Sequence, residues 1–140
     1  MTKPATLTVG ATVENLARIA EFLEKTLHDA GCPEETIFSV QLAVDEAGSN
    51  VMLYGYPDGD AGTLTVTCEV REGTIRLTLT DDGRPFDPLT IEPPDLDADL
   101  EHRKIGGLGI HFMRSVMDDV GYDYIDGKNV LCMIKREGGT

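Results

Sequence analysis

The sequence predicts a two-layer α+β sandwich, in which helices cover one face of a mixed, mainly antiparallel sheet. Segments of alternating polar and apolar residues occur in pairs joined by short turns, as in antiparallel hairpins. Segments with apolar residues at three- and four-residue steps predict helices with a single apolar face, suited to one side of a sheet. The 140 residues suit one domain with its own core, so we expect residues 1–140 to form a single unit.

The first strand is expected at Ala5–Ala11, where Leu7 and Val9 fall on one side. Thr12 is placed to cap the helix that follows, and Gly31 to end it. The apolar face of this helix is expected to comprise Val13, Leu16, Ala20, Leu23 and Leu27.

A second helix is expected to open at Pro33, because proline and the two acids after it suit a first helical turn. Residues 55–59, which include two glycines and a proline, break it. Its core stripe is predicted to be Ile37, Val40, Val44, Ala47 and Val51.

Two alternating segments, Thr63–Val70 and Thr74–Thr80, flank the two-residue turn Glu72-Gly73 and predict a hairpin. The chain from Asp81 to Lys104 is acidic and proline-rich and has no lasting period. A connection this long inside a compact domain is more often functional than passive.

A third helix is expected from about Leu108 to Val120, followed by a closing hairpin of Tyr122–Ile125 and Asn129–Lys135 around a turn at residues 126–128. The inward residues of the helix are predicted to be Ile110, Met113, Val116 and Met117.

The charge and composition of the sequence indicate which partners and which cellular location to expect. The formal net charge of -13 argues against a nucleic-acid partner. The sequence has no apolar signal core and no run approaching a membrane span, which favours a cytoplasmic protein without membrane contact. Cys32, Cys68 and Cys132 are far apart and lack metal-ligand spacing, so they are interpreted as buried thiols in a reducing compartment.

The second helix carries the first candidate functional pair. Glu46 and Asn50 are four residues apart, so they share one side of the helix, off the apolar stripe. A carboxylate can take a proton and an amide oxygen can hold Mg²⁺, although a solvated Glu/Asn pair has the same spacing. Small neighbours leave room for a ligand beside the helix: Ala43, Ala47, Gly48 and Ser49.

Two further segments supply the other parts of a nucleotide site. Asp81 ends a predicted buried strand, where its carboxylate can accept a hydrogen bond from an exocyclic amine, and Gly83 lets the backbone turn beneath a flat base. A plain acidic turn is the alternative. The glycines at residues 106–109 precede a predicted helix, whose free amides can bind phosphate, although glycine-rich loops are often only turns.

The order of these three segments resembles the N, G1 and G2 boxes of the GHKL ATPase superfamily, carried here by residues 41–50, 81–88 and 106–110. The sequence of elements also resembles that superfamily's Bergerat fold. Within it, the chain is most similar to the small anti-sigma-factor serine kinases. The resemblance covers nearly the whole chain and implies an ATP-binding domain with a lid at about residues 84–106.

The resemblance implies a role for each matching residue. Asn50 would bind the Mg²⁺ that bridges the ATP phosphates, and Glu46 would act as general base on a serine hydroxyl. Asp81 would bind the adenine amine, with Gly83 under the base. The phosphates would be contacted by amides and side chains of Arg103, Lys104, Gly106, Gly107, Leu108 and Gly109. Arg103 and Lys104 can equally be exposed charges of the lid.

The resemblance also implies partners. Such kinases phosphorylate a serine on a STAS-type anti-anti-sigma protein, sequester a sigma factor when free, and commonly form homodimers. Two departures stand out: Pro85 occupies the place of a frequent second G1 glycine, and Leu53-Tyr54 replaces basic residues common after the N-box asparagine.

We therefore expect a Mg²⁺- and ATP-dependent protein serine/threonine kinase. One alternative is a non-catalytic module in which nucleotide orders the lid and the protein acts by sequestering a partner. A second is the catalytic half of a sensor histidine kinase, although the chain has no helix pair carrying a phosphoacceptor histidine. A third is an α+β domain without a ligand.

Overall fold

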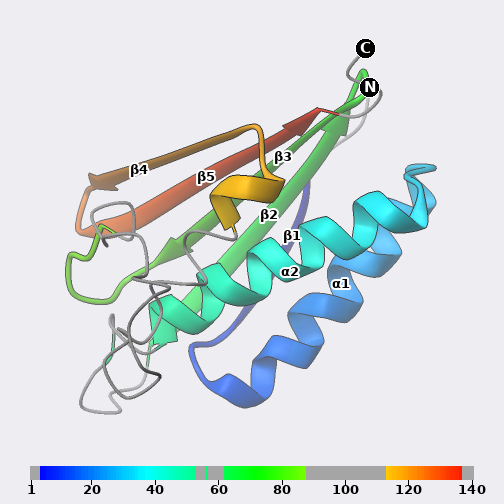
Figure 1. Cartoon of the computed structure of the whole chain (residues 1–140). Coiled ribbons are helices and arrows are strands. Elements are labelled where there is room, and N and C mark those ends of the chain that lie inside the picture. Colours follow the sequence, from blue (N-terminus) through cyan, green and yellow to red (C-terminus); the bar gives the residue numbers. More distant parts are fainter. Residues whose placement is uncertain (1–3, 53–55, 57–61, 88–112, 137–140) are drawn as a thin grey trace, which may run out of the picture.

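The structure, a computed structural model, describes residues 4–52, 56, 62–87 and 113–136. Two antiparallel helices lie side by side over one face of a five-stranded sheet (Figure 1), which confirms the predicted α+β sandwich. The elements are β1 (Ala5–Gly10), the 3₁₀ turn η1 (Val13–Asn15), α1 (Leu16–Asp29), α2 (Glu34–Asn50), β2 (Thr63–Arg71), β3 (Thr74–Asp81), β4 (Asp119–Ile125) and β5 (Lys128–Arg136).

The strand order β1-β2-β3-β5-β4 places the last strand of the chain beside β3. The expectation of a mainly antiparallel sheet is confirmed, and every pairing among the described strands is antiparallel. In the register between β3 and β5, Asp81 pairs with Asn129. The end of β3 and the start of β5 therefore lie side by side at the same end of the sheet.

Two hairpin turns fix these registers. Glu72 and Gly73 join β2 to β3 with φ of 51° and 75°, and Asp126 and Gly127 join β4 to β5 with φ of 52° and 78°. Two successive positive φ angles define a type I′ turn, which matches the twist of the strands and favours glycine at its second position. Both predicted hairpins are confirmed.

The first helix starts differently from the prediction. A 3₁₀ turn precedes α1, and Thr12 makes no side-chain capping bond; its hydroxyl instead accepts a hydrogen bond from Asn15 Nδ2 at 3.2 Å. Because a 3₁₀ turn has three residues per turn, Val13 leaves the α-helical stripe and is 63% exposed. Ile19 is buried instead, and the predicted end at Gly31, with φ of 84°, is confirmed.

The second helix buries its predicted stripe against the sheet. Ile37, Val40, Val44 and Ala47 are buried, whereas Val51, just after α2, is half-buried. The core between the two layers is completed by large, fully buried side chains from α1 and the strands: Leu23, Leu27, Leu64, Val66, Ile75, Leu77, Leu79 and Met133.

The predicted third helix is too long at its C-terminal end. Its first residues, 108–112, lie outside the described residues, and residues 113–116 are helical, with Met113 and Met117 buried as predicted. Residue 119 already belongs to β4, because that segment pairs with β5 and the backbone N–H of Asp118 donates to Ile134 O at 2.8 Å. Val120 suits an inward position in a helix or a strand, so the sequence pattern alone did not separate the two.

Within the described residues, no helix is both long enough and apolar enough to cross a membrane. Cys32, Cys68 and Cys132 form no disulfide with one another; the first two are buried, whereas Cys132 is half-buried.

Candidate functional site

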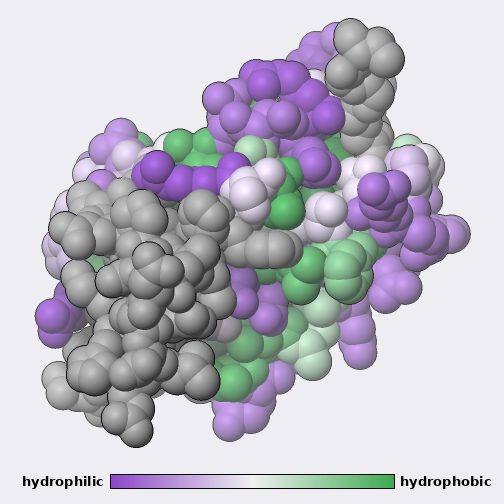
Figure 2. Space-filling view, in the orientation of Figure 1, coloured by the Kyte–Doolittle hydropathy of each residue, from purple (hydrophilic) through white to green (hydrophobic). Residues whose placement is uncertain are grey.

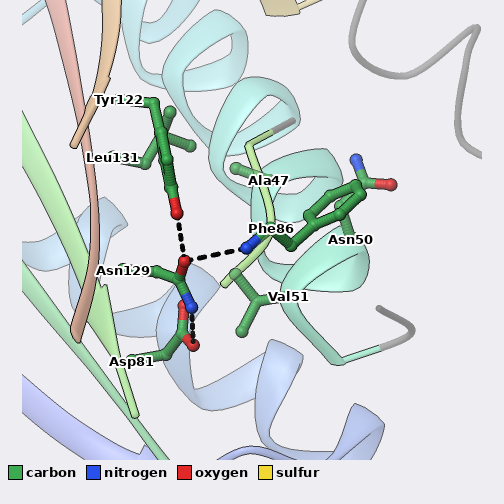
Figure 3. Close-up of a pocket in the computed structure, with 8 residues that line it drawn as sticks. All are labelled: Ala47, Asn50, Val51, Asp81, Phe86, Tyr122, Asn129 and Leu131. Atoms are coloured by element: carbon green, nitrogen blue, oxygen red, sulfur yellow. Dashed lines mark hydrogen bonds between the residues drawn. The ribbon is translucent and has the colours of Figure 1, made fainter. Parts of the chain in front are cut away.

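A cavity of about 330 Å³, including the space at its open mouth, lies between the C-terminal end of α2 and the adjoining ends of β3 and β5 (Figure 3). Asn50 and Asp81, predicted separately from distant parts of the sequence, both line it. The described residues that line it are Ala47, Asn50, Val51, Asp81, Phe86, Tyr122, Asn129 and Leu131.

Asp81 is a buried carboxylate with one oxygen held by the protein. Its side chain is 4% exposed, and Oδ1 accepts hydrogen bonds from the backbone N–H of Gly83 at 2.9 Å and from Asn129 Nδ2 at 3.0 Å. Burial raises the pKa of Asp81, and the charge of Asp82 adds to this, while the two hydrogen bonds act in the opposite direction. Among the described residues Oδ2 accepts no hydrogen bond, so it is available to a donor on a ligand.

Asn129 is the main site residue that sequence reasoning missed. Its Nδ2 donates to Asp81 and to the backbone oxygens of Gly83 and Arg84, at 3.3 and 2.9 Å. Its Oδ1 accepts from the N–H of Phe86 at 3.1 Å and from the hydroxyl of Tyr122. This single side chain, seen at the centre of Figure 3, ties the turn after β3 to the closing hairpin.

The sequence did contain a signal for Asn129. Residues 129, 131 and 133 alternate inward along β5, and the last two are Leu131 and Met133 in the core. A polar side chain at an inward position of such a strand must have buried partners. Apart from Tyr122, the partners lie 43 to 48 residues earlier in the chain, so their identity could not be predicted from this pattern.

Replacing Asn129 with alanine is expected to lower the free energy of unfolding by about 2–4 kcal/mol, because several buried polar groups lose partners together. Urea unfolding of the two proteins measures the difference. Asn15 offers a matched control, since its side chain also bonds a backbone oxygen, that of Gly10 at 2.9 Å, but at an exposed position. An equal loss from both substitutions would contradict the role assigned to Asn129.

The neighbouring carboxylate of Asp82 is bonded outside this cavity. It accepts hydrogen bonds from the hydroxyl of Tyr56 and, at 3.2 Å, from the backbone N–H of Thr63. These bonds, the one from Tyr56 first, lower the pKa of Asp82. Among the described residues that line the cavity, Asp81 is the one carboxylate.

Asn50 lines the cavity from the α2 side. It is 2% exposed, and its Nδ2 donates to the backbone oxygen of Glu46 at 2.8 Å. Because a carbonyl oxygen only accepts, the atom facing it must be the nitrogen, which leaves the amide oxygen directed elsewhere. The expectation that Asn50 lies off the buried side is wrong: it aligns with the buried residues Ala43 and Ala47.

Glu46 lies one helical turn before Asn50 and is half-buried, but it is not among the residues lining the cavity. Burial raises the pKa of Glu46, and the adjacent charge of Asp45 raises it further. A raised pKa makes the carboxylate a better proton acceptor near neutral pH.

Several predicted site residues lie outside the described residues. They are Arg103, Lys104, Gly106, Gly107, Leu108 and Gly109. The same holds for Leu53, Tyr54 and residues 88–106 of the predicted lid. Residues 84–87 at the start of that segment are described, and two of them are fixed to Asn129 through Arg84 O and Phe86 N. Gly83 is not in the cavity lining, and its place under a base stays a prediction.

The oxygen atoms at the cavity suit a bound magnesium nucleotide. In the described part of the chain, no three His, Cys, Asp or Glu side chains gather to hold a metal ion. Mg²⁺ in nucleotide sites is held largely by substrate phosphates and water, with one or two protein oxygens. One amide oxygen of Asn50, a free oxygen of buried Asp81 and apolar walls between them fit such a group.

Comparison with known proteins gives the family. Residues 9–135 match the histidine kinase-like ATPase domain family. A serine-protein kinase RsbW from Listeria monocytogenes is 33% identical over 106 residues, 73% of this chain and 68% of the relative. A serine-protein kinase RsbW from Staphylococcus aureus is 30% identical over 117 residues, 80% of this chain and 74% of the relative.

A solved structure supports the fold. The crystal structure of the RsbU and RsbW domains of a Mycobacterium tuberculosis protein superimposes with a TM-score of 0.69 at 16% identity, over 96% of this chain. This chain spans 32% of that larger one. With a family match over most of its length, this chain belongs to the histidine kinase-like ATPase family.

Proposed function

We propose that this protein is a Mg²⁺- and ATP-dependent protein serine/threonine kinase that acts on a STAS-type anti-anti-sigma protein and binds a sigma factor. The observation that carries the proposal is the shared cavity of Asn50 and Asp81, two buried polar side chains that each have an oxygen available. The names of the relatives, serine-protein kinases, support the same activity.

In this proposal Asp81 recognises adenine. Oδ1 is already bonded to Gly83 and Asn129, so the carboxylate is fixed with Oδ2 towards the exocyclic amine of the base. Leu131 and Ala47, which line the cavity, provide apolar contacts for the ring. Gly83, which is outside this lining, is proposed to pass beneath the base as part of the turn after β3.

Asn50 holds the metal through its amide oxygen, while Nδ2 stays bonded to the helix backbone. The phosphates are bound by Arg103 and Lys104 and by the backbone amides of residues 106–109. Mg-ATP, when bound, supplies an activated γ-phosphoryl group.

Glu46 accepts the proton of the acceptor serine hydroxyl. Its raised pKa suits this role, because a base with a pKa closer to the working pH transfers protons more effectively. Glu46 and Asn50 are one turn apart on α2, which supports a proposed base close to the proposed metal ligand rather than to the adenine.

The proposal includes a homodimer and a cytoplasmic location. The sheet face opposite α1 and α2 in Figure 1 offers a surface for a second copy, and light scattering of the purified protein measures the stoichiometry. Three cysteines without a disulfide suit a reducing compartment. A monomer at assay concentration would remove the dimer from the proposal without affecting the kinase activity.

Phosphotransfer is the test of the proposed function. The purified protein is incubated with Mg²⁺, γ-labelled ATP and each purified STAS-domain protein from the same genome, and labelled serine is identified by mass spectrometry. We expect a phosphoserine on one acceptor, none without Mg²⁺, and none on that acceptor with its serine changed to alanine. ATP binding together with tight acceptor binding, but without a labelled product, would instead support the non-catalytic module.

A further inference from the structure

We infer that the acceptor protein docks along the exposed side of α2, on a strip defined by Phe38, Leu42 and Glu46, and that its own surface there is apolar with a basic rim. This rests on the proposed function, because it takes Glu46 as the base that receives the serine proton. The strip would determine which proteins present a serine to this site.

The first observation is the exposure of an aromatic side chain on a helix that otherwise buries its apolar residues. Phe38 is 63% exposed, whereas its neighbours Ile37 and Val40 are 2% and 0% exposed. A single exposed apolar residue has no special meaning. Phe38, however, is followed one turn later by Leu42, which lies outside the hydrophobic core and is half-buried.

The second observation is the direction of this strip. Phe38, Leu42 and Glu46 follow one another at four-residue steps, so they lie along one side of the helix. The strip extends about 12 Å, at 1.5 Å per residue, and ends at the proposed base. A protein that delivers a hydroxyl to Glu46 must cover this end of α2, and a standard interface of about 800 Å² per partner would also reach Phe38.

The third observation is the charge around the strip. α2 carries four acidic residues, Glu34, Glu35, Asp45 and Glu46, and its sequence contains no lysine, arginine or histidine. Figure 2, seen from the helical side, shows apolar groups at the surface beside strongly hydrophilic ones. An apolar centre with a charged rim is the usual composition of a protein interface. The acidic rim is complementary to lysine and arginine on the partner rather than to a second acidic copy of this chain.

The inference is tested with Phe38→Ala on the STAS-domain acceptor identified by phosphotransfer. We expect KM for the acceptor, and its Kd from calorimetry with Mg-ATP present, to rise about 10- to 30-fold, as for an interface hot spot. The kcat and the Kd for ATP should stay within about twofold, because Phe38 does not line the nucleotide cavity.

Further variants separate docking from a change in folding or charge. Phe38→Leu should restore most of the affinity, whereas Glu35→Lys should raise KM independently by reversing a rim charge. Val13→Ala is the matched control: Val13 is 63% exposed, like Phe38, but belongs to the 3₁₀ turn η1 and lies outside the strip. It should leave KM unchanged.

Failure of the inference is distinguishable from failure of the proposed function. If no STAS-domain protein is phosphorylated although ATP binds, the kinase proposal fails and the docking strip fails with it. If phosphotransfer proceeds and Phe38→Ala leaves KM and Kd unchanged, only the strip is overturned. Conversion of a dimer to a monomer by Phe38→Ala, with KM unchanged, would assign the strip to a second copy and overturn the inference.

Discussion

Replacing Glu46 with alanine is expected to slow phosphotransfer to the acceptor serine about 10²–10⁴-fold, the usual effect of removing a general base. ATP affinity should not change, because Glu46 is absent from the cavity lining and holds Asn50 only through its backbone oxygen, which the variant retains. Single-turnover transfer of γ-label measures the rate, and calorimetry measures the Kd for ATP.

Two further variants make this result specific. Glu46→Gln keeps the shape of the side chain without its basicity, so it should be nearly as slow as the alanine variant. Glu24→Ala removes an exposed carboxylate from α1 and should leave the rate unchanged. Phosphotransfer at the wild-type rate in Glu46→Ala would show that Glu46 is not the base.

Replacing Asp81 with asparagine should weaken ATP binding about 10- to 150-fold, which corresponds to the loss of a hydrogen bond to a charged, buried acceptor. The same change should preserve or increase the stability of the nucleotide-free protein at pH 7. Burial raises the pKa of Asp81 in the folded state, so its ionised form opposes folding. That unfavourable contribution develops as pH rises from the unfolded pKa through the folded pKa, and it is absent at lower pH.

Thermal unfolding between pH 4 and pH 8, together with calorimetric titration of ATP, tests both parts of this prediction. The stability difference between Asp81→Asn and the wild type should shrink as pH falls. Asp82→Asn is the matched control with the opposite sign, because hydrogen bonds lower the pKa of Asp82 and its ionised form stabilises the fold. Unchanged ATP affinity in Asp81→Asn would remove Asp81 from the proposed adenine site.

The sequence predicted those parts of the fold and site that depend on local patterns. The Glu72-Gly73 turn between alternating strands has one favourable geometry, so the hairpin could be placed to within a residue. Asp81 could be singled out because it ends a buried strand, and Glu46 and Asn50 because helical spacing places them on one side. The convergence of Asp81 and Asn50 in one cavity could be expected only from the family resemblance, since no local pattern relates α2 to the end of β3.

The parts that were missed depend on partners distant in the chain. Asn129 forms hydrogen bonds with polar groups 43 to 48 residues away in the sequence. Only the folded chain brings these groups close to it. Residue 119 belongs to β4 because it pairs with β5. The sequence around it fits a helix as well as a strand, so the local pattern did not predict this pairing. The 3₁₀ turn starts at Val13 where the Asn15 side chain donates hydrogen bonds to Gly10 O and Thr12 Oγ1. Residue preferences do not predict this start, because it differs too little in energy from an α-helical one.

Comparison of ATP and GTP binding tests most directly whether the cavity between Asn50 and Asp81 is an adenine nucleotide site. Guanine carries a carbonyl oxygen where adenine carries its exocyclic amine, so the buried Asp81 carboxylate would face another acceptor. Calorimetric titration with Mg²⁺ present should show ATP binding at least about 100-fold tighter than GTP, with the difference reduced in Asp81→Asn. Equal affinity for the two nucleotides, or no binding of either, would contradict this account of the site.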